Sequence, residues 1–370
     1  MAREIQMAPS PGRPFDGAGV RRISRLDLAK MVKIGTWNVR SLMEMGKLKN
    51  VTIEMEKMDI GILGVCETRW HGAGKFESDG YTVHYSGVPK GKHRSGMAVI
   101  IRKDIAEAIK QVTPVTDRII LIQFDAKPVP VSVIQVYAPT SDSSDEDIED
   151  FYDNHEKTLR ATKKNEAKIV IGDFNAKVGN LAGNVTGRYG LGNRNERGER
   201  LIQFCQTNKL IVGNTYFKLP KCRLYTWKAP GDNLNNVIRN QIDYFLINRR
   251  YRNALKSVKT YPGADANTDH TLLLAKLKIK LKKVEKVKPK RFRLELLKNK
   301  EISRKVQKTL NKNLREKSNQ IDGTVDSGWA AFKEAALQTA EELLRQNGDR
   351  RTQKEWITDE IIALFEKRRD

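Results

Sequence analysis

The sequence predicts a mixed α/β fold with a helical extension at its C-terminal end. Short β-branched runs such as Ile169-Val170-Ile171 indicate buried strands, and apolar residues at three- and four-residue steps between such runs indicate helices. A third observation sets the boundary between the two parts. After Leu281 the composition changes to a dense run of lysine and arginine, and the apolar residues beyond it keep helical spacing. We therefore expect one large α/β domain and a smaller helical part.

Composition divides the chain into four segments. Residues 1–30 hold three prolines, three glycines and scattered arginines, and predict a disordered N-terminal tail. The α/β domain is expected over 31–281, a basic linker over 282–293 and the helical extension over 294–370.

The first expected strand is a segment in which apolar and other residues alternate, and Asn38 follows at its end. The expected strands cover 32–37, 60–66, 82–85, 97–102, 119–124, 131–136, 169–171, 210–212, 241–247 and 272–281. Leucine and isoleucine alternate with lysine in 272–281, which predicts a half-exposed strand. Helices are expected over 48–58, 141–164 and 201–208, and residues 225–239 are expected to form a hairpin with an exposed tip.

The charge balance points to a polyanionic partner. The chain has 68 Lys and Arg against 45 Asp and Glu, a net charge of +23. Nucleic acid is the first candidate and an anionic membrane the second, while a solvated basic face is the alternative that needs no partner. No apolar run approaches the ~20 residues of a transmembrane helix, and residues 1–30 show no secretory signal. We expect duplex DNA, and no membrane, as the partner, because the basic hairpin and helical tail favour nucleic acid.

The three cysteines, Cys66, Cys205 and Cys222, form no Cys-x-x-Cys pair. The sequence therefore predicts neither a zinc ribbon nor a redox motif, and the sparse set suits a reducing compartment.

The segment Gly172-Asp173-Phe174-Asn175 follows the strand at 169–171. Alternate side chains of an extended chain point the same way, so Asp173 and Asn175 would face one cleft. A carboxylate can orient or deprotonate water, and an amide can hold a phosphate oxygen or the same water. An Asx turn after a strand is the alternative reading of this motif.

Other polar residues also stand at or next to expected strand ends, with Asp243 inside a strand as the exception. The full set is Asn38, Glu67, Tyr137, Asp173, Asn175, Asp243, Asp269 and His270. A lone glutamate among oxygen donors suits Mg²⁺, and the absence of paired thiols argues against zinc. A metal, an imidazole and a carboxylate-held water can together hydrolyse a phosphodiester. Each residue also has an ordinary structural explanation, such as a strand-end charge or a surface ion pair.

Seven ordered motifs resemble those of the exonuclease–endonuclease–phosphatase superfamily, and most of all the apurinic-like endonuclease domain of non-LTR (LINE-type) retrotransposons. They are 36–42 (Thr-Trp-Asn-Val-Arg-Ser-Leu), 66–70 (Cys-Glu-Thr-Arg-Trp), 95–99 (Ser-Gly-Met-Ala-Val), 135–139 (Gln-Val-Tyr-Ala-Pro), 172–175, 241–244 (Gln-Ile-Asp-Tyr) and 268–270 (Thr-Asp-His). The resemblance covers residues 32–281 and implies a four-layer α/β/β/α sandwich of two packed mixed sheets flanked by helices.

The resemblance also implies Mg²⁺-dependent nicking of duplex DNA, with Mn²⁺ as a substitute ion and no small-molecule cofactor. Carried over residue by residue, Glu67 binds the metal with Asn38 close by, and Asp269 supports the metal or His270. Asp173 orients or activates the water, and Asn175 and Tyr137 hold the scissile phosphate. His270 contacts the phosphate or acts as base, and Asp243 orients it.

One position departs from the abasic-site repair enzymes of this superfamily. Residue 40 is arginine, where the repair enzymes carry an acid and the retroelement branch carries arginine. The resemblance therefore implies a retrotransposon-type enzyme, with Arg40, Arg69, Tyr225, Thr226 and Trp227 as DNA contacts and the 225–239 hairpin probing a groove. Two alternatives stay open: a non-catalytic DNA-binding or interaction protein, and a phosphatase or phosphodiesterase on another substrate. The basic linker and the DNA substrate together lead us to expect a nuclear protein, with the cytoplasm as a second location, and the sequence leaves the oligomeric state open.

Overall fold

The computed structural model describes residues 25–89, 95–233, 235–281, 292–317 and 324–345. The chain divides into two compact units, Met1–Lys282 and Lys283–Asp370. Among the described residues, no helix combines the length and the apolar content that crossing a bilayer requires.

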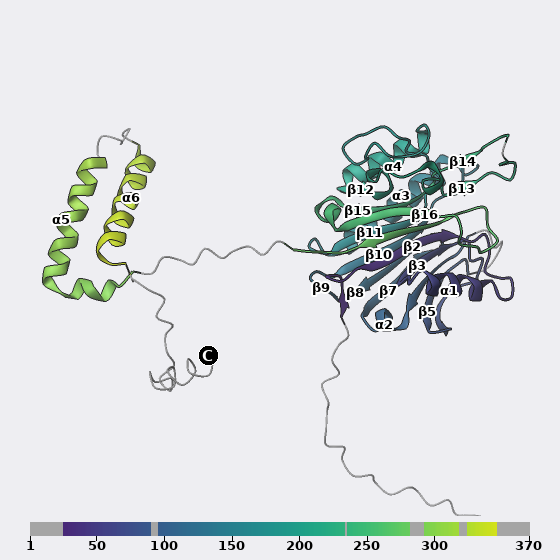
Figure 1. Ribbon diagram of the computed structural model, residues 1–370, viewed down its shortest axis with the longest axis horizontal. Helices are drawn as coiled ribbons and strands as arrows, with labels where there is room; N and C mark the ends of the chain where they lie inside the picture. The colour runs from purple at the N-terminus through teal and green to yellow at the C-terminus, as the bar shows by residue number, and fades with distance from the viewer. Residues whose placement is uncertain (1–24, 90–94, 234, 282–291, 318–323, 346–370) are drawn as a thin grey trace, which may run out of the picture. The chain divides into compact units, whose positions relative to one another are not determined.

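Two large mixed β-sheets build the first unit (Figure 1). The seven-stranded sheet has the order β16-β17-β2-β3-β6-β5-β4. Its strands are β2 (Val32–Asn38), β3 (Ile62–Cys66), β4 (Ala73–Ser78), β5 (Tyr81–Ser86), β6 (Met97–Arg102), β16 (Leu255–Tyr261) and β17 (Leu272–Leu277). The six-stranded sheet has the order β12-β15-β11-β10-β8-β7. Its strands are β7 (Ile109–Thr116), β8 (Ile119–Phe124), β10 (Val131–Tyr137), β11 (Ala167–Asp173), β12 (Leu210–Val212) and β15 (Asp243–Asn248).

Helices flank the two sheets (Figure 1). They are α1 (Lys47–Lys57), α2 (Lys103–Ala106), α3 (Asp145–Ala161) and α4 (Glu196–Thr207), with short 3-10 helices at Gly213–Tyr216, Lys221–Arg223 and Arg249–Ala254. The acidic stretch that predicted a helix start gives α3 a capping box, in which Ser144 and Asp147 bond each other's backbone.

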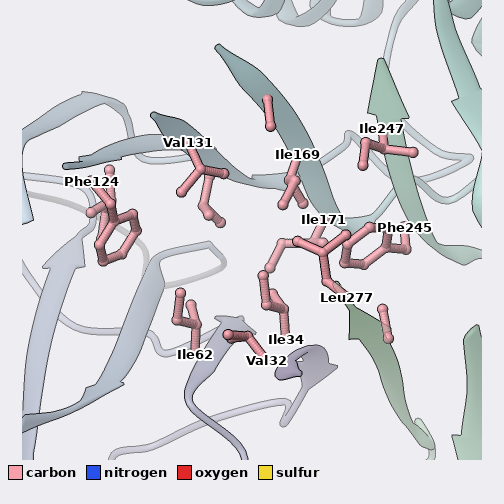
Figure 2. Packing of buried hydrophobic residues seen from close by; sticks show 14 of the residues in the cluster. Val32, Ile34, Ile62, Phe124, Val131, Ile169, Ile171, Phe245, Ile247 and Leu277 are labelled. Carbon is pink, nitrogen blue, oxygen red and sulfur yellow. The ribbon is translucent and has the colours of Figure 1, made fainter. Parts of the chain in front are cut away.

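Three apolar layers hold the four structural layers together. The middle layer lies between the sheets and combines Ile34 and Ile62 of one with Ile169 and Ile171 of the other (Figure 2). An outer layer packs α3 and α4 on the six-stranded sheet, and a second outer layer packs α1 on the seven-stranded sheet. Because the central strands are buried on both faces, they have nearly continuous apolar sequences. The four-layer sandwich is confirmed.

Strand direction brings six strand termini to one edge of the sandwich. β2 is parallel to β3, and β10 is parallel to β11. β17 runs antiparallel to β2, and β15 runs antiparallel to β11. The last residues of the four parallel strands therefore lie beside the first residues of β15 and β17, and this edge carries the candidate site.

Several elements differ from the sequence-based expectations. β1 (Leu26–Asp27) pairs with β9 (Ala126–Lys127), and Leu28 is fully buried, so the expected disordered tail is ordered from residue 25. Residues 1–24 of that tail and the basic loop at 90–94 lie outside the described residues. β17 is buried on both faces instead of half-exposed, because one face packs in the middle layer and the other against the α1 layer.

The second unit is a pair of helices, α5 (Lys300–Lys317) and α6 (Val325–Leu343), preceded by the 3-10 helix Leu294–Lys298. Buried Asn313 of α5 donates to Thr339 of α6 at 3.0 Å, which links the two helices across their shared face. Most of the linker predicted at 282–293 lies outside the described residues.

Candidate active site

A cleft of about 860 Å³ opens at the edge where the six strand termini meet. Ten of the thirteen sequence-predicted site residues line it: Asn38, Arg40, Glu67, Arg69, Tyr137, Asp173, Asn175, Trp227, Asp269 and His270. Asp243 lies directly behind His270, whereas Tyr225 and Thr226 are elsewhere and buried.

Strand ends position the polar side chains. Asn38, Tyr137 and Asp173 are the last residues of β2, β10 and β11, and Glu67 directly follows β3. Asp243, which the sequence placed inside a strand, is in fact the first residue of β15. Because β15 is antiparallel to β11, its first residue pairs with Asp173 and lies at the same edge. All the predicted catalytic carboxylates therefore lie at strand termini or next to them.

Asn38 links the two sheets through its amide. Its Nδ2 donates to Glu67 Oε1 at 2.8 Å and to Asp173 Oδ2 at 3.0 Å, and its Oδ1 accepts from the Arg40 backbone N–H at 3.0 Å. The Asn38 side chain is buried. With its oxygen bonded to the backbone, Asn38 orients the two carboxylates rather than offering a metal ligand of its own.

Glu67 is also held by Tyr137, whose hydroxyl donates to Glu67 Oε1 at 3.0 Å. Burial and the neighbouring carboxylates of Glu67 and Asp173 raise the pKa of Tyr137 well above its usual value, so the phenol stays protonated and remains a donor. The second oxygen, Glu67 Oε2, faces the cleft rim, where Arg69 Nη2 lies 3.5 Å away.

His270 and Asp243 form a buried pair. His270 Nδ1 lies 3.0 Å from Asp243 Oδ2, and His270 Nε2 lies 3.8 Å from Asp173 Oδ2. Burial lowers the pKa of His270, but the charge and hydrogen bond of Asp243 outweigh it and raise the pKa to about 9. The imidazole is therefore charged at neutral pH and presents an N–H from Nε2 toward Asp173.

Asp173 has an unusual protonation equilibrium. Its side chain is buried, and burial together with the charge of Asp243 raises its pKa to about 7, against the opposing effects of His270 and two hydrogen bonds. A carboxyl with a pKa near the working pH can accept and release a proton in the same cycle.

Asn175 lines the cleft beside Asp173. Its backbone N–H donates to Asp173 Oδ1 at 2.9 Å, which is the Asx-turn geometry of the alternative reading, and its Nδ2 donates to the Ala138 carbonyl at 2.9 Å. The residue thus combines the turn with a place in the cleft. Its φ of 47° lies in the left-handed region, as do those of Arg40 (58°), Glu67 (58°) and Arg69 (61°). Such backbone strain concentrates at functional sites.

The donor set of the cleft fits a hard divalent cation. Glu67 and Asp173 offer carboxylate oxygens held by one amide, and Asp269 lies beside them with Oδ2 accepting from Trp227 Nε1 at 3.1 Å. Among the described residues, Asp173, Asp243 and His270 also form a buried group whose ligand atoms lie within 4.8 Å of one another and could hold a metal. A histidine nitrogen suits softer ions, and oxygen-only ligands suit Mg²⁺.

Two of the residues predicted to contact DNA, Tyr225 and Thr226, are buried and cannot make that contact. Thr226 is fully buried, and its Oγ1 accepts from the backbone N–H groups of Ile242 and Asp243 at 2.9 and 3.0 Å. Tyr225 is buried beneath Lys228 and Arg239, whose cationic groups lie 5.6 and 4.9 Å from its ring. Both residues support the hairpin formed by β13 (Trp227–Lys228) and β14 (Arg239–Asn240), and Trp227 alone of the three reaches the cleft.

Sequence reasoning missed several cleft residues: Arg118, Lys177, Asn195 and Asn240. Arg118 lies 5.1 Å from the Tyr137 ring centroid and donates to the Tyr137 carbonyl at 3.3 Å. Asn195 caps α4 by accepting from the Gly198 N–H at 2.9 Å. None of these residues belongs to a recognised motif: Arg118, Lys177 and Asn195 lie outside the regular elements, and Asn240 ends the short strand β14. Lys177 lies two residues after Asn175, so the alternation of side chains along an extended chain could have identified it.

Known proteins match this chain in sequence and in fold. Residues 35–270 match the model of the endonuclease/exonuclease/phosphatase family. The chain is 44% identical over 255 residues to craniofacial development protein 2 of Bos taurus, a match that covers 68% of this chain. The chain spans about two fifths, 42%, of the length of that relative.

Two solved structures share the fold. The 3′ phosphatase NExo from Neisseria, bound to a product DNA hairpin, matches with a TM-score of 0.52 and 20% identity, over 67% of this chain and 100% of that one. The AP endonuclease LMAP from Leishmania major matches with a TM-score of 0.51 and 14% identity, over 68% and 89% respectively.

Proposed function

Because the chain belongs to the endonuclease/exonuclease/phosphatase family, whose members include phosphodiester hydrolases, we propose that it is a Mg²⁺-dependent endonuclease that nicks duplex DNA. The main observation in support is a chain of hydrogen bonds that joins Tyr137, Glu67, Asn38 and Asp173. At its end, Asp173 Oδ2 lies 3.8 Å from Nε2 of His270, which is paired with Asp243. This chain of hydrogen bonds joins the ends of both sheets around one cleft and brings together carboxylates, an imidazole and a phenol, which are groups that such a hydrolysis uses.

The protonation states suggest a role for each acid and base. Asp173, with a pKa of about 7, takes the proton of the attacking water as the new P–O bond forms. His270, charged below a pKa of about 9, offers its Nε2 proton to a phosphate oxygen while Asp243 fixes the ring. The Asn175 amide lies at the cleft wall, where it positions the phosphate. Tyr137 acts through Glu67, to which its hydroxyl donates. As the P–O bond to the leaving group breaks, the departing sugar oxygen takes a proton from solvent.

Glu67, supported by Asn38 and Asp269, would hold the Mg²⁺. When bound, the ion supplies Lewis-acid stabilisation of the charge on the phosphate. Oxygen donors favour Mg²⁺ at Glu67 over the nitrogen-containing Asp173–Asp243–His270 group. Mn²⁺ has similar ligand preferences and is expected to replace it.

Duplex DNA as the substrate is supported by charge and by the fold. Arg40, Arg69, Arg118 and Lys177 surround the carboxylates of the cleft and can neutralise phosphates on either side of the scissile one. NExo, which shares the fold, holds a DNA hairpin. The arginine at position 40 and the β13–β14 hairpin favour a retrotransposon-type nickase over a repair enzyme, and we propose the nucleus as its location, which imaging of a tagged chain would test.

The test is nicking of supercoiled plasmid with Mg²⁺ or with EDTA. We expect Mg²⁺-dependent nicking that Asp173→Ala and His270→Ala abolish, while exposed Asp150→Asn, as a matched control, leaves it unchanged. Nicking that persists in EDTA, or in both site variants, would refute the assignment.

A non-catalytic DNA-binding role is the second candidate. It is favoured by the 44% identity to a protein named for craniofacial development. Glu67→Gln separates the two candidates, because a nuclease loses cleavage while keeping DNA affinity, whereas a binding protein has no cleavage to lose. Tight plasmid binding with no nicking by the unaltered chain would establish the binding role.

A further inference from the structure

The end of the first unit opposite the cleft carries a second basic surface. Two hollows of about 1040 and 290 Å³ lie there and share Arg250 in their linings. Six exposed basic residues line them, and we call this set the end face: Lys164, Lys209, Arg249, Arg250, Lys256 and Lys280. These residues lie before the starts of β11 and β12, after the ends of β15 and β17, and at the start of β16. The seven residues of β11 separate them from Asp173 by about 20 Å.

The lining of the end face is basic and amide-rich. Its other polar residues include Asn184, Gln206, Asn248 and Asn253, and no acidic residue lines either hollow within the described parts of the chain. Lysine, arginine and side-chain amides are the groups that bind phosphate and sugar in nucleic acids.

Within the described parts of the chain, the end-face charges have no carboxylate partners. None of the six forms an ion pair with any described acid, whereas Arg102, Arg200 and Arg239 elsewhere on the unit bind Asp104, Glu149 and Asp232 at 2.6 to 2.9 Å. Clustered like charges repel one another, so leaving them unpaired costs free energy that a polyanion would recover.

The fold holds two of the contributing loops in place. The Arg249 backbone N–H donates to the Lys209 carbonyl at 2.8 Å, which joins the turn after α4 to the 3-10 helix Arg249–Ala254. Lys209 has a φ of 54°, and its neighbour Leu210 begins the buried strand β12. The charges are therefore presented on a fixed backbone, which lowers the entropy cost of binding a partner.

We propose that the end face binds the phosphate backbone of a nucleic-acid segment other than the one in the cleft. Duplex DNA has a persistence length of about 50 nm, so one straight segment cannot contact both ends of a sandwich that is about 20 Å deep. Leu281 is the one large exposed apolar side chain in the two hollows, which favours nucleic acid over a lipid surface that apolar side chains would have to enter. The protein thereby bridges two nucleic-acid segments.

The experiment compares two triple variants of the full chain. Lys209→Gln/Arg249→Gln/Arg250→Gln neutralises the end face, and Lys57→Gln/Lys75→Gln/Lys103→Gln removes the same charge from exposed residues of α1, β4 and α2. A bead-bound 30-bp duplex captures a free labelled 30-bp duplex, or a labelled 30-nucleotide RNA, through the protein. Anisotropy measures how the affinity for the free duplex depends on NaCl.

We expect the end-face variant to lose capture at least fivefold, and its slope of log affinity against log salt to fall by about 2 to 3, since each lost phosphate contact removes about 1. The control should keep both, and the nicking rate of both variants should stay within twofold of the unaltered chain. His270→Ala should still capture, so failure of the proposed nuclease would leave this inference standing.

Three results would overturn the inference. Capture unaffected by the end-face variant would show that the surface is not used. Equal loss of capture in the control would show a general charge effect. Loss of binding to phosphatidylserine vesicles, with nucleic-acid capture intact, would assign the surface to a membrane. Should the triple variant fail to fold by circular dichroism, Arg250→Gln alone carries the same comparison.

Discussion

Asn38 joins two carboxylates that come from different sheets. One nitrogen donates to both Glu67 and Asp173, so the distance between a proposed metal ligand and a proposed base is set by a single amide. The backbone N–H of Arg40 fixes which end of the amide faces the carboxylates. Arg40 therefore has a local structural role as well as a place at the cleft rim.

Asp243 is expected to act on the reaction through His270. Asp243→Asn removes the charge that keeps the imidazole protonated and oriented, while the side chain keeps its size. We expect plasmid nicking to fall by about 10² to 10⁴, with DNA affinity within twofold of the unaltered chain. Nicking kinetics at saturating Mg²⁺ measure this, with exposed Asp150→Asn as the control. A fall of less than threefold would remove Asp243 from the mechanism.

His155, which lies outside the cleft, makes the free energy of unfolding depend on pH. The ring is fully buried against Phe204, with a centroid distance of 4.4 Å, and neither nitrogen has a hydrogen-bond partner among the described residues. Burial lowers its pKa from 6.5 to about 3. Because the pKa is lower in the folded state than in the unfolded state, where it is 6.5, the protein has its full free energy of unfolding above pH 6.5. That free energy decreases as pH falls from 6.5 toward 3.

At pH 5 the loss is about 2 kcal/mol, because each pH unit below 6.5 costs about 1.4 kcal/mol. His155→Leu removes this titration. Between pH 7.5 and pH 5, the variant should therefore lose about 2 kcal/mol less of its free energy of unfolding than the unaltered protein loses. Urea unfolding at the two pH values measures it. Exposed His71→Leu should keep the original dependence, and an unchanged dependence in His155→Leu would contradict the expectation.

At the scale of elements, the contact between β10 and β11 places Asp173. Gly172 has a φ of 148°, and a Cβ there would lie 1.9 Å from the Val136 carbonyl oxygen of the neighbouring strand. Only glycine allows the two parallel strands to approach this closely one residue before Asp173. The glycine of the Gly-Asp-Phe-Asn motif is thus required by the sheet itself.

Gly172→Ala should therefore destabilise the protein and move Asp173. Backbone strain and overpacking each cost about 1 to 3 kcal/mol, so we expect a loss of about 2 to 6 kcal/mol. Denaturant unfolding measures the loss. Gly231→Ala is the matched control, because its Cβ would meet no atom within 4 Å. A stability change below about 1 kcal/mol at Gly172 would show that the strands can separate without penalty.

At the scale of the whole molecule, the three apolar cores all belong to residues 25–281. Residues 283–370 carry 22 Lys and Arg against 15 Asp and Glu, so they contribute +7 of the net +23. The first unit has the cores needed for independent folding, while the second adds net positive charge.

A chain that ends at Lys282 should therefore keep the nicking rate at saturating DNA and a thermal midpoint within about 2 °C of the first unit in the full chain. Its DNA affinity should fall, because positive charge is lost, and its salt dependence should be weaker. Differential scanning calorimetry and nicking at several NaCl concentrations test this. Aggregation or a lost catalytic rate would show that the first unit needs the second.

The strands buried on both faces could be predicted from the amino-acid sequence, because their apolar runs are long and continuous. Strands β4 and β7 could not be predicted, because they are largely exposed. Exposed and half-exposed side chains alternate along β4, and β7 contains Pro114, which argues against a strand by sequence rules although an edge strand tolerates it.

The polar residues at and after the strand ends could be predicted from the sequence, because each motif is local. Asn38, Glu67, Tyr137 and Asp173 all lie where the local pattern placed them. The distances between these residues depend on the tertiary structure, because Asn38 and Asp173 are 135 residues apart and meet through sheet packing. The start of a strand at Asp243, the burial of Thr226 and Tyr225, and the gathering of basic residues at the opposite end also depend on it. Burial and pairing depend on neighbours distant in the chain, and no local pattern records them.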